Sequence, residues 1–309
     1  MKEIKFGVRW PDFDVPINKA TVRDFVQAAE DLGFDHVTTF DHVAGISDEA
    51  LGRHSHFPEH LEFGEALTLI AHMSGVSKSL GFLTNILNLG YRQTVLVAKQ
   101  FATLDLLTDG RMRLGMGIGA VEVEFQVLGM SDIYHQRGAR AIEQVEVLRL
   151  LWTTAPASFE GRWHNFPNIA LNPLPPQQPI PIWMGMGWDP PDRVLRRIAG
   201  YADGVLPPWT PGEKAYEMRD KIFNLAREMG RDPAKIGLEP RINLRSGSGQ
   251  GPDQAPRKTD EEIAEHIAAW KEFGADFVEF KLRQCGLKGL DEHVTEMANF
   301  MEIARSVLG

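Results

Sequence analysis

The chain has 309 residues, of which 43% are apolar, and it contains a single cysteine, Cys285. One thiol cannot form an internal disulfide, which excludes a small secreted scaffold held together by disulfides. The 33 Lys and Arg against 42 Asp and Glu give a net charge of -9, which argues against a nucleic-acid partner. No secretory leader is evident and no apolar run approaches the roughly 18 residues of a membrane span, so we expect a cytoplasmic protein without a membrane partner.

Runs of apolar and β-branched residues alternate with segments of helical periodicity. The first strand is predicted at 4–9, followed by a helix at 21–32 with Thr21 as its N-cap and Gly33 as its C-terminal stop. Further strands are predicted at 36–40, 80–88, 112–119, 180–184, 204–207, 235–245 and 277–282. Further helices are predicted at 63–76, 94–107, 137–152, 190–201, 212–229, 260–273 and 290–307.

Eight strands alternating with helices predict an α/β fold, a single (β/α)8 TIM barrel over residues 1–309. A doubly wound sheet has the same alternation, but the loop Trp10-Pro11-Asp12 after the first strand lacks the glycines of a dinucleotide site. Two segments interrupt the rhythm. Residues 155–179 predict an inserted hairpin, and the glycine-rich residues 246–258 after the seventh strand predict either a mobile lid or an inert loop.

In a barrel of this kind the chemistry lies at the carboxyl ends of the strands. Asp41 and His42 are the most informative pair there, because histidine can donate or accept a proton near neutral pH. A structural histidine beside a loop-capping aspartate is the alternative. The other polar or aromatic residues at these ends are Arg9, Trp10, Asn85, Asn88, Glu122, Glu124, Trp209, Arg241, Arg245, Lys281 and Arg283.

Two glycine patterns also fall at strand ends. In 114–119 every second residue is glycine, which would let a backbone or a flat ligand approach one face closely, or would only relieve crowding. Gly185-Met186-Gly187 ends the fifth strand, and Asp189-Pro190 is expected to begin a helix directly after it. Free amides in such a turn suit a phosphate group, whereas a tight turn that binds nothing is the alternative.

Other patterns are weaker. His54, His56 and His60 could suggest a metal site, but they lie in a polar loop with no strand to hold them, so we favour a solvated loop and expect no metal. No serine or cysteine nucleophile with a base partner is evident. Several tryptophans near the strand ends are candidates for lining an apolar pocket, and others for the core: Trp10, Trp163, Trp183, Trp188 and Trp209.

The chain resembles the luciferase-like monooxygenase family, and within it the probable coenzyme F420-dependent oxidoreductases. The segments that carry the resemblance follow one another along nearly the whole chain: Leu96 to Gly119, Phe159 to Phe166, Asn172 to Gly187, Tyr201 to Pro207, Gly230 to Ile236 and Thr259 to Phe280. This resemblance implies a (β/α)8 barrel that uses either FMN or the deazaflavin coenzyme F420.

The resemblance also implies roles for particular residues. Asp41 and His42 match a pair that contacts the deazaflavin, with the histidine near its reactive centre. Asn85-Ile86 matches a non-proline cis peptide bond behind the ring, and Asn88 a nearby cofactor contact. Gly185, Met186 and Gly187 match the backbone cradle of the cofactor phosphate, although Met186 replaces a glycine of the usual pattern.

One departure bears on the substrate. In the related sugar-phosphate dehydrogenases a glutamate acid follows the fourth-strand glycines directly, whereas this chain has Ala120 there, with Glu122 and Glu124 displaced. Glucose-6-phosphate activity therefore does not follow from the resemblance.

We expect a cytoplasmic homodimer that transfers hydride between coenzyme F420 and a small organic substrate, with His42 as the catalytic residue. The alternatives are an FMN-dependent monooxygenase of the alkanal or alkanesulfonate type, which uses reduced FMN and oxygen, and a non-catalytic flavin-binding barrel.

Overall fold

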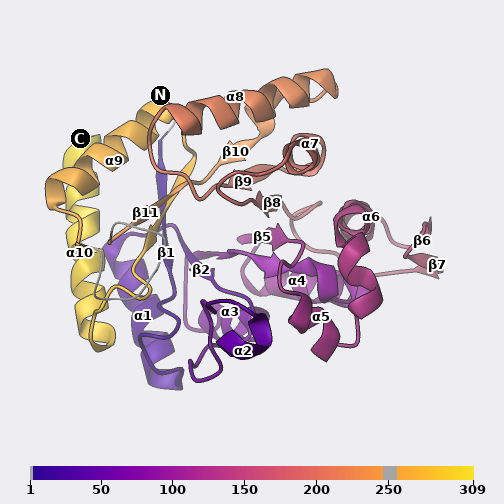
Figure 1. Ribbon diagram of the computed structural model, residues 1–309, viewed down its shortest axis with the longest axis horizontal. Coiled ribbons are helices and arrows are strands. Elements are labelled where there is room, and N and C mark those ends of the chain that lie inside the picture. Colours follow the sequence, from indigo (N-terminus) through magenta and orange to yellow (C-terminus); the bar gives the residue numbers. More distant parts are fainter. Residues whose placement is uncertain (1–2, 246–255) are drawn as a thin grey trace.

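Parallel strands form one ten-stranded sheet in the computed structural model, which describes residues 3–245 and 256–309. The sheet is the centre of the molecule, with helices outside it (Figure 1). Its order is β10-β9-β8-β5-β3-β2-β1-β12-β11, with β4 paired to β5. The strands are β1 (Lys5–Arg9), β2 (His36–Thr39), β3 (Gly81–Thr84), β4 (Leu87–Asn88), β5 (Met112–Gly117), β8 (Ile182–Gly185), β9 (Gly204–Leu206), β10 (Gly237–Leu238), β11 (Arg241–Asn243) and β12 (Phe277–Lys281).

The sheet closes on itself through β10 and β11, which are separated only by Glu239 and Pro240. β10 pairs with β9, and β11 pairs with β12 at the other end of the sheet. Glu239 N donates to Val205 O at 3.0 Å, and Glu279 N donates to Pro240 O at 2.9 Å. Proline has no amide to continue a ladder, so the prediction of one unbroken strand over 235–245 is wrong. The predicted barrel is confirmed as a TIM-barrel-like fold.

The long helices pack around this sheet and bury their apolar faces against it in one core. They are α1 (Lys19–Leu32), α3 (Ala66–Ser74), α4 (Thr94–Leu107), α6 (Arg137–Thr153), α7 (Asp192–Tyr201), α8 (Glu213–Glu228), α9 (Asp260–Phe273) and α10 (Gly289–Leu308). Elements absent from the sequence predictions are α2 (Asp48–Leu51), α5 (Glu122–Val127) and the 3-10 turns Leu89–Tyr91, Ser131–Gln136 and Pro233–Lys235. Within residues 3–245 and 256–309, no helix has both the length and the apolar character needed to cross a membrane.

Three predicted helix starts are wrong by two or three residues. α3 begins at Ala66 and not at residue 63. α1 begins at Lys19 because the Asn18 side chain accepts hydrogen bonds from the amides of Ala20 and Thr21, so Asn18 and not Thr21 is the N-cap. Its predicted end is right, since Gly33 adopts φ +86° at the C-cap. α7 begins at Asp192 with Pro191 as the N-cap residue, so the turn at 185–187 does not lead directly into the helix.

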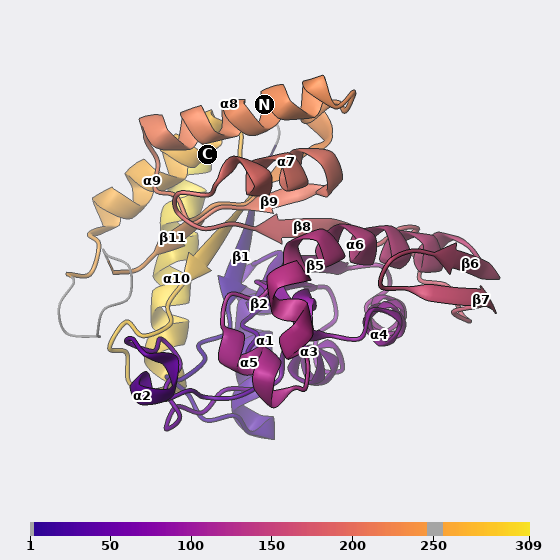
Figure 2. The ribbon, with the colours of Figure 1, turned by 45° about the vertical axis from the view of Figure 1, so that its right-hand side comes forward.

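An antiparallel hairpin, β6 (Ala157–Glu160) and β7 (Asn165–Ile169), is inserted between α6 and β8 and projects from the barrel beside α6 (Figure 2). Glu143 of α6 fixes its turn by accepting hydrogen bonds from the amides of Arg162, Trp163 and His164 at 2.7–2.8 Å. The candidate lid at 246–258 falls mainly on residues 246–255, which lie outside the described residues.

A buried ion pair crosses the barrel interior. The Glu239 carboxylate, from the interruption between β10 and β11, lies 2.7 Å from His36 Nε2 on β2 and 2.6 Å from Arg113 Nη1 on β5. The Arg113 guanidinium also packs over the ring of Phe277 at 3.9 Å. Burial raises the pKa of Glu239, but Arg113 and His36 outweigh that effect and bring the pKa to about 2.

We expect Glu239→Gln to lower the free energy of unfolding at pH 7 by about 3–5 kcal/mol, because the buried Arg113 guanidinium loses its carboxylate partner. Since the folded pKa lies below the ordinary 4.5, the stabilisation is fully present above pH 4.5 and disappears as the pH falls towards 2. Urea unfolding at pH 7, 4.5 and 3 should therefore show the variant converging with the wild type in acid. The exposed Glu272→Gln is the control, and a wild-type–variant gap that is independent of pH would contradict the prediction.

Candidate active site

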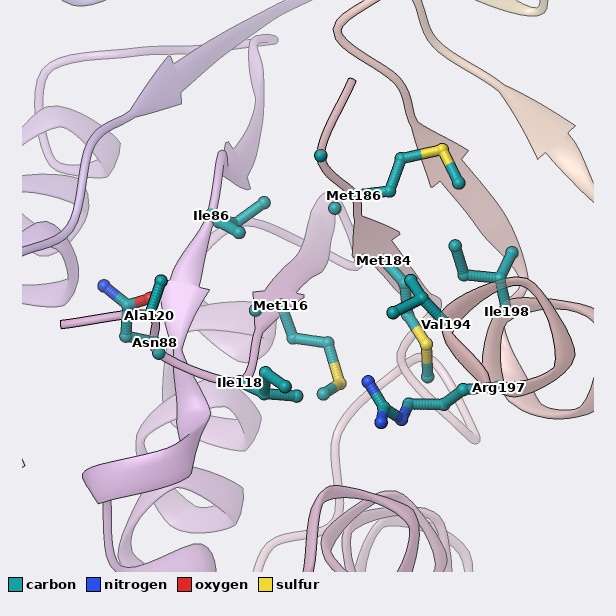
Figure 3. Close-up of a pocket in the computed structure, with 14 residues that line it drawn as sticks. Ile86, Asn88, Met116, Ile118, Ala120, Met184, Met186, Val194, Arg197 and Ile198 are labelled. Carbon is teal, nitrogen blue, oxygen red and sulfur yellow. The ribbon is translucent and has the colours of Figure 1, made fainter. Parts of the chain in front are cut away.

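Two adjoining cavities open at the carboxyl ends of the strands. The larger has a volume of about 440 Å³ and the smaller about 300 Å³. Five residues line both, so the cavities form one bent slot with these residues at the bend: Ile86, Asn88, Ala120, Gly185 and Met186. Figure 3 shows the smaller cavity, between the chain that follows β4 and β5 on one side and β8 and α7 on the other. This face carries the predicted site residues.

His42 lines the larger cavity, and its ring is fixed on two sides. Its Nδ1 lies 2.9 Å from Glu124 Oε1, and its ring stacks on Phe57 with the centroids 3.7 Å apart. Glu124 Oε1 also accepts from Val43 N at 3.1 Å, so this oxygen is an acceptor. The geometry therefore assigns the donor role in the contact to His42 Nδ1 and fixes the orientation of the ring, as a proton-transferring histidine requires.

Asp41 is held by hydrogen bonds to neighbouring residues of the chain. Its carboxylate accepts from Arg92 Nη2 at 2.6 Å and from the amide of Asn88 at 2.8 Å, and its carbonyl accepts from Asn88 Nδ2 at 2.8 Å. Burial raises the pKa of Asp41, and the Arg92 guanidinium opposes that rise. Asp41 thus fixes Asn88 at the bend between the cavities.

The Asn85-Ile86 peptide bond is cis, as the resemblance implied. Arg9 Nη2 donates to Asn85 O at 3.0 Å, and Asn85 Nδ2 donates to the buried Glu279 carboxylate at 3.0 Å. The Ile86 side chain projects to where a Cβ on Gly117 or on Gly185 would overlap it. These two glycines therefore leave room for Ile86, and Gly115 leaves room for the backbone of Thr84, whereas the sequence pattern alone also allowed a ligand on that face.

The turn Gly185-Met186-Gly187 lines the smaller cavity together with Arg197 of α7, which sequence reasoning missed. Figure 3 shows Arg197 reaching from α7 towards Met116. Its Nε is buried without a hydrogen-bond partner in the described part of the chain. Asp189, expected to cap this helix, instead lies 3.4 Å from Lys214 Nζ. The positive charge on this side of the slot thus comes from an arginine almost two turns into α7.

Several other sequence candidates lie elsewhere. None of the tryptophans 10, 163, 183, 188 and 209 lines either cavity, and the aromatic wall is Phe40 and Phe57. Among the described residues, no group of three metal-ligating side chains lies together, and of the three loop histidines only His56 lines the slot. Burial raises the pKa of the Cys285 thiol to about 11, so it is no nucleophile near neutral pH.

A family model described as luciferase-like monooxygenase matches residues 11–275. The chain belongs to the luciferase-like monooxygenase family. This confirms the family suggested by the sequence motifs, and with it the expectation of an oxidoreductase from that family.

Proteins that resemble this chain include ones named for F420 and one whose structure contains modified FMN. An F420-dependent glucose-6-phosphate dehydrogenase of Amycolatopsis mediterranei (strain U-32) is 29% identical over 226 residues, which cover 70% of this chain but only 62% of that relative. An F420-dependent secondary alcohol dehydrogenase superposes with a TM-score of 0.77 at 19% identity over 99% of both chains. Riboflavin lyase with modified FMN gives a TM-score of 0.78 at 14% identity, over 99% of this chain and 92% of its own. The two solved structures establish the likeness of the fold.

The structure explains why Ala120 stands after the glycines of β5, where related sugar-phosphate dehydrogenases have a glutamate. Ala120 lines both cavities and offers no acid, but the chain turns there into α5 and places Glu124 under His42. Glu122, two residues earlier on α5, is exposed. The position of Glu124 at a strand end was visible in the sequence, whereas its contact with a loop 82 residues away was not.

We expect Glu124→Met to release the His42 tautomer, because the carboxylate that accepts the Nδ1 proton is removed. In ¹⁵N spectra of the neutral ring, the wild type should show Nδ1 protonated, and the variant a shift towards Nε2–H. Losing two charge-assisted hydrogen bonds should also lower the free energy of unfolding by about 1.5–3 kcal/mol. Glu122→Met, on the exposed side of the same helix, is the control, and an unchanged tautomer in the Glu124 variant would contradict the assignment.

Proposed function

We propose that this protein is a coenzyme F420-dependent oxidoreductase that transfers hydride to or from a small organic substrate. The observation that carries the proposal is the slot: the oriented His42 lines the larger cavity, Arg197 lines the smaller one with a buried Nε that has no hydrogen-bond partner among the described residues, and Ile86 lies where the two cavities join. A long, flat cofactor with an anionic tail matches this order of groups.

The residues of the slot fit such a cofactor. Ile86, on the cis bond, offers an apolar surface for one face of a ring, and Asn88 is fixed beside it by Asp41. Asn85 supports Ile86 through its bonds to Arg9 and Glu279. Gly185, Met186 and Gly187 line the smaller cavity together with Arg197, and their backbone groups and the Arg197 guanidinium suit a phosphate. The orphaned Nε of Arg197 is the sign that a negatively charged partner belongs there.

The bound deazaflavin would supply hydride chemistry at its ring carbon, and the chain would supply the proton transfer that accompanies it. When a carbon that bears a hydroxyl is oxidised, a hydride and a proton leave; in the reverse direction both return. His42 Nε2 can take or return that proton, since Glu124 holds the Nδ1 proton in place. Phe40 and Phe57 limit the access of water to the imidazole, with Phe57 stacked directly on it.

The FMN-dependent monooxygenase remains the second candidate, because the fold is shared with a protein that binds modified FMN and because a pyrimidine monooxygenase of Allorhizobium ampelinum is 28% identical over 229 residues. The relatives named for F420 decide our order of preference. Both cofactors carry a phosphate and a flat ring, so the slot accommodates the chemistry of either.

Side-by-side titrations with F420 and FMN test the proposal. We expect F420 to bind at least about tenfold more tightly than FMN, with no oxygen consumption when reduced FMN is added. Preferred FMN binding with oxygen consumption would support the monooxygenase instead, and indifference to both cofactors would overturn the assignment. With an active substrate, His42→Ala should retain cofactor binding and lose about 10²–10⁴-fold in turnover; unchanged turnover would exclude His42 as the catalytic group.

Arg197 provides a test of how the tail is held. We expect Arg197→Met to weaken cofactor binding about 10- to 100-fold, because one charge-assisted contact with a phosphate is lost while the bulk of the side chain is kept. Arg196→Met, an exposed neighbour on α7 outside both cavities, should leave binding unchanged. Equal effects of the two variants in a fluorescence titration would show that Arg197 does not hold the tail.

A further inference from the structure

The wall of the larger cavity is strongly basic although the whole chain carries a net charge of -9. Among the described residues that line it, the only carboxylate is Asp41, which is already engaged by Arg92. Against this stand five cationic side chains from different parts of the fold: Arg9, Arg53, Arg241, Lys281 and Arg283. An acidic protein thus concentrates positive charge at one point on its catalytic face.

Two buried carboxylates lie behind this wall, Glu279 and Asp12. Glu279 Oε1 accepts from Arg9 Nε at 2.9 Å, from Asn85 Nδ2 at 3.0 Å and from the Thr38 hydroxyl, and Oε2 accepts from Arg9 Nη2 at 3.3 Å. Within residues 3–245 and 256–309, Arg241 and Lys281 make no side-chain hydrogen bond to Glu279, and the Asp12 carboxylate makes none to Arg283. Asp12 acts on Arg283 through its charge, and burial raises the pKa of Asp12 to about 7.

Two of the arginines have donor groups with nothing to bind. In the described part of the chain, Arg241 Nε and both Nε and Nη1 of Arg283 are buried without a hydrogen-bond partner. The Arg283 guanidinium packs over the rings of Phe13 and Phe40, 5.0 and 4.6 Å from their centroids, which fixes its plane and leaves its edge available. Buried donors of this kind are normally satisfied, so these donors indicate a ligand with acceptor oxygens.

The mutual repulsion of these cations supports the same conclusion. Burial, followed by Arg283 and Arg241, lowers the pKa of Lys281 well below its usual value. Burial, with the further effect of Arg9, lowers the pKa of Arg283 to about 10. An anion placed among these groups would relieve the repulsion and favour their charged forms.

The basic groups lie on the opposite side of the slot from the proposed cofactor tail. Arg9, Arg241 and Lys281 belong to β1, β11 and β12 and line only the larger cavity, whereas Gly187 and Arg197, on the β8 and α7 side, line only the smaller one. His42 lines the same cavity as the basic groups. A molecule that contacts both His42 and the basic groups therefore lies on the side of the proposed cofactor ring where a substrate would bind.

We propose that Arg241 and Arg283, with Lys281 beside them, form a subsite for an anionic group of the substrate, so that the substrate is a small organic carboxylate, phosphate ester or sulfonate. Calling the bound molecule a substrate rests on the proposed function, whereas the anion subsite itself does not require F420. Arg241 and Arg283 would bind the anionic end and so orient the reacting carbon towards His42, as a guanidinium fork does for a carboxylate or phosphate.

The wild-type protein, with and without its cofactor, provides the first test by calorimetry. Benzoate, inorganic phosphate and inorganic sulfate are the anionic probes, and benzamide is the neutral analogue of benzoate. We expect benzoate to bind at least about tenfold more tightly than benzamide, and phosphate or sulfate to compete with it. Benzoate and benzamide binding equally, or no anion binding at all, would overturn the proposal without any variant being made.

The second test locates the site. Arg241→Met, Arg283→Met and the double variant keep side-chain volume but remove the charge, and the double variant should lose benzoate binding by at least about tenfold while cofactor affinity changes less than about threefold. Arg283→Lys should restore part of the binding, and the exposed Arg23→Met is the control. Benzoate affinity that is unaffected by the double variant would place the anion elsewhere and overturn the assignment.

The cofactor titrations distinguish failure of this subsite from failure of the proposed function. If neither F420 nor FMN binds, the function fails whatever benzoate does. If a cofactor binds but displaces benzoate competitively, the basic groups serve the cofactor, and the substrate subsite is wrong while the function stands. Simultaneous binding of benzoate and cofactor is the expected result.

Discussion

The Glu279 carboxylate, buried in the middle of β12, holds together the part of the barrel on which the candidate active site depends. It binds the Arg9 guanidinium from β1, the Thr38 hydroxyl from β2 and the Asn85 amide that follows β3. Arg9 in turn donates to Asn85 O, so the cis peptide is bound on both the side-chain and backbone sides of Asn85. Loss of this carboxylate would remove the partner of the buried Arg9 guanidinium and the support of Asn85 after β3. The interaction therefore affects both the stability of the fold and the shape of the slot.

The position of the Ile86 side chain follows from the fixed position of Asn85 and from two glycines across the barrel that leave room for it. With Asn85 fixed, the Ile86 side chain projects towards β5 and β8, where only glycine leaves room at 117 and 185. On the other side Asp41, held by Arg92, fixes Asn88. The bend of the slot is therefore determined by contacts among four strands, and a larger residue at either glycine would move Ile86 and alter the surface offered to a cofactor.

Charge is distributed unevenly through the same interior. Deeper in the barrel Glu239 balances His36 and Arg113, and at the next level Glu279 balances Arg9. At the cavity wall the balance ends: Arg241, Lys281 and Arg283 line the slot, and no carboxylate among the described residues is hydrogen-bonded to their side chains. The interior charges thus change from structural pairs to groups available for a ligand as the barrel opens to the surface.

The sequence by itself determined the alternation of strands and helices, the inserted hairpin, the family, and the positions of His42, the cis bond and the glycine turn, because these depend on local periodicity and on motifs of consecutive residues. It did not determine that Asn18 caps α1 or that α7 begins only at Asp192, because neighbouring residues offered competing local signals for each helix start. That Pro240 divides the seventh strand was decided by tertiary pairing, since β10 pairs with β9 and β11 with β12. Only the folded chain showed Glu124 beneath His42, Arg197 in the smaller cavity, and unpaired donors on Arg241 and Arg283. These contacts join residues far apart in the sequence, and barrel closure alone brings them together.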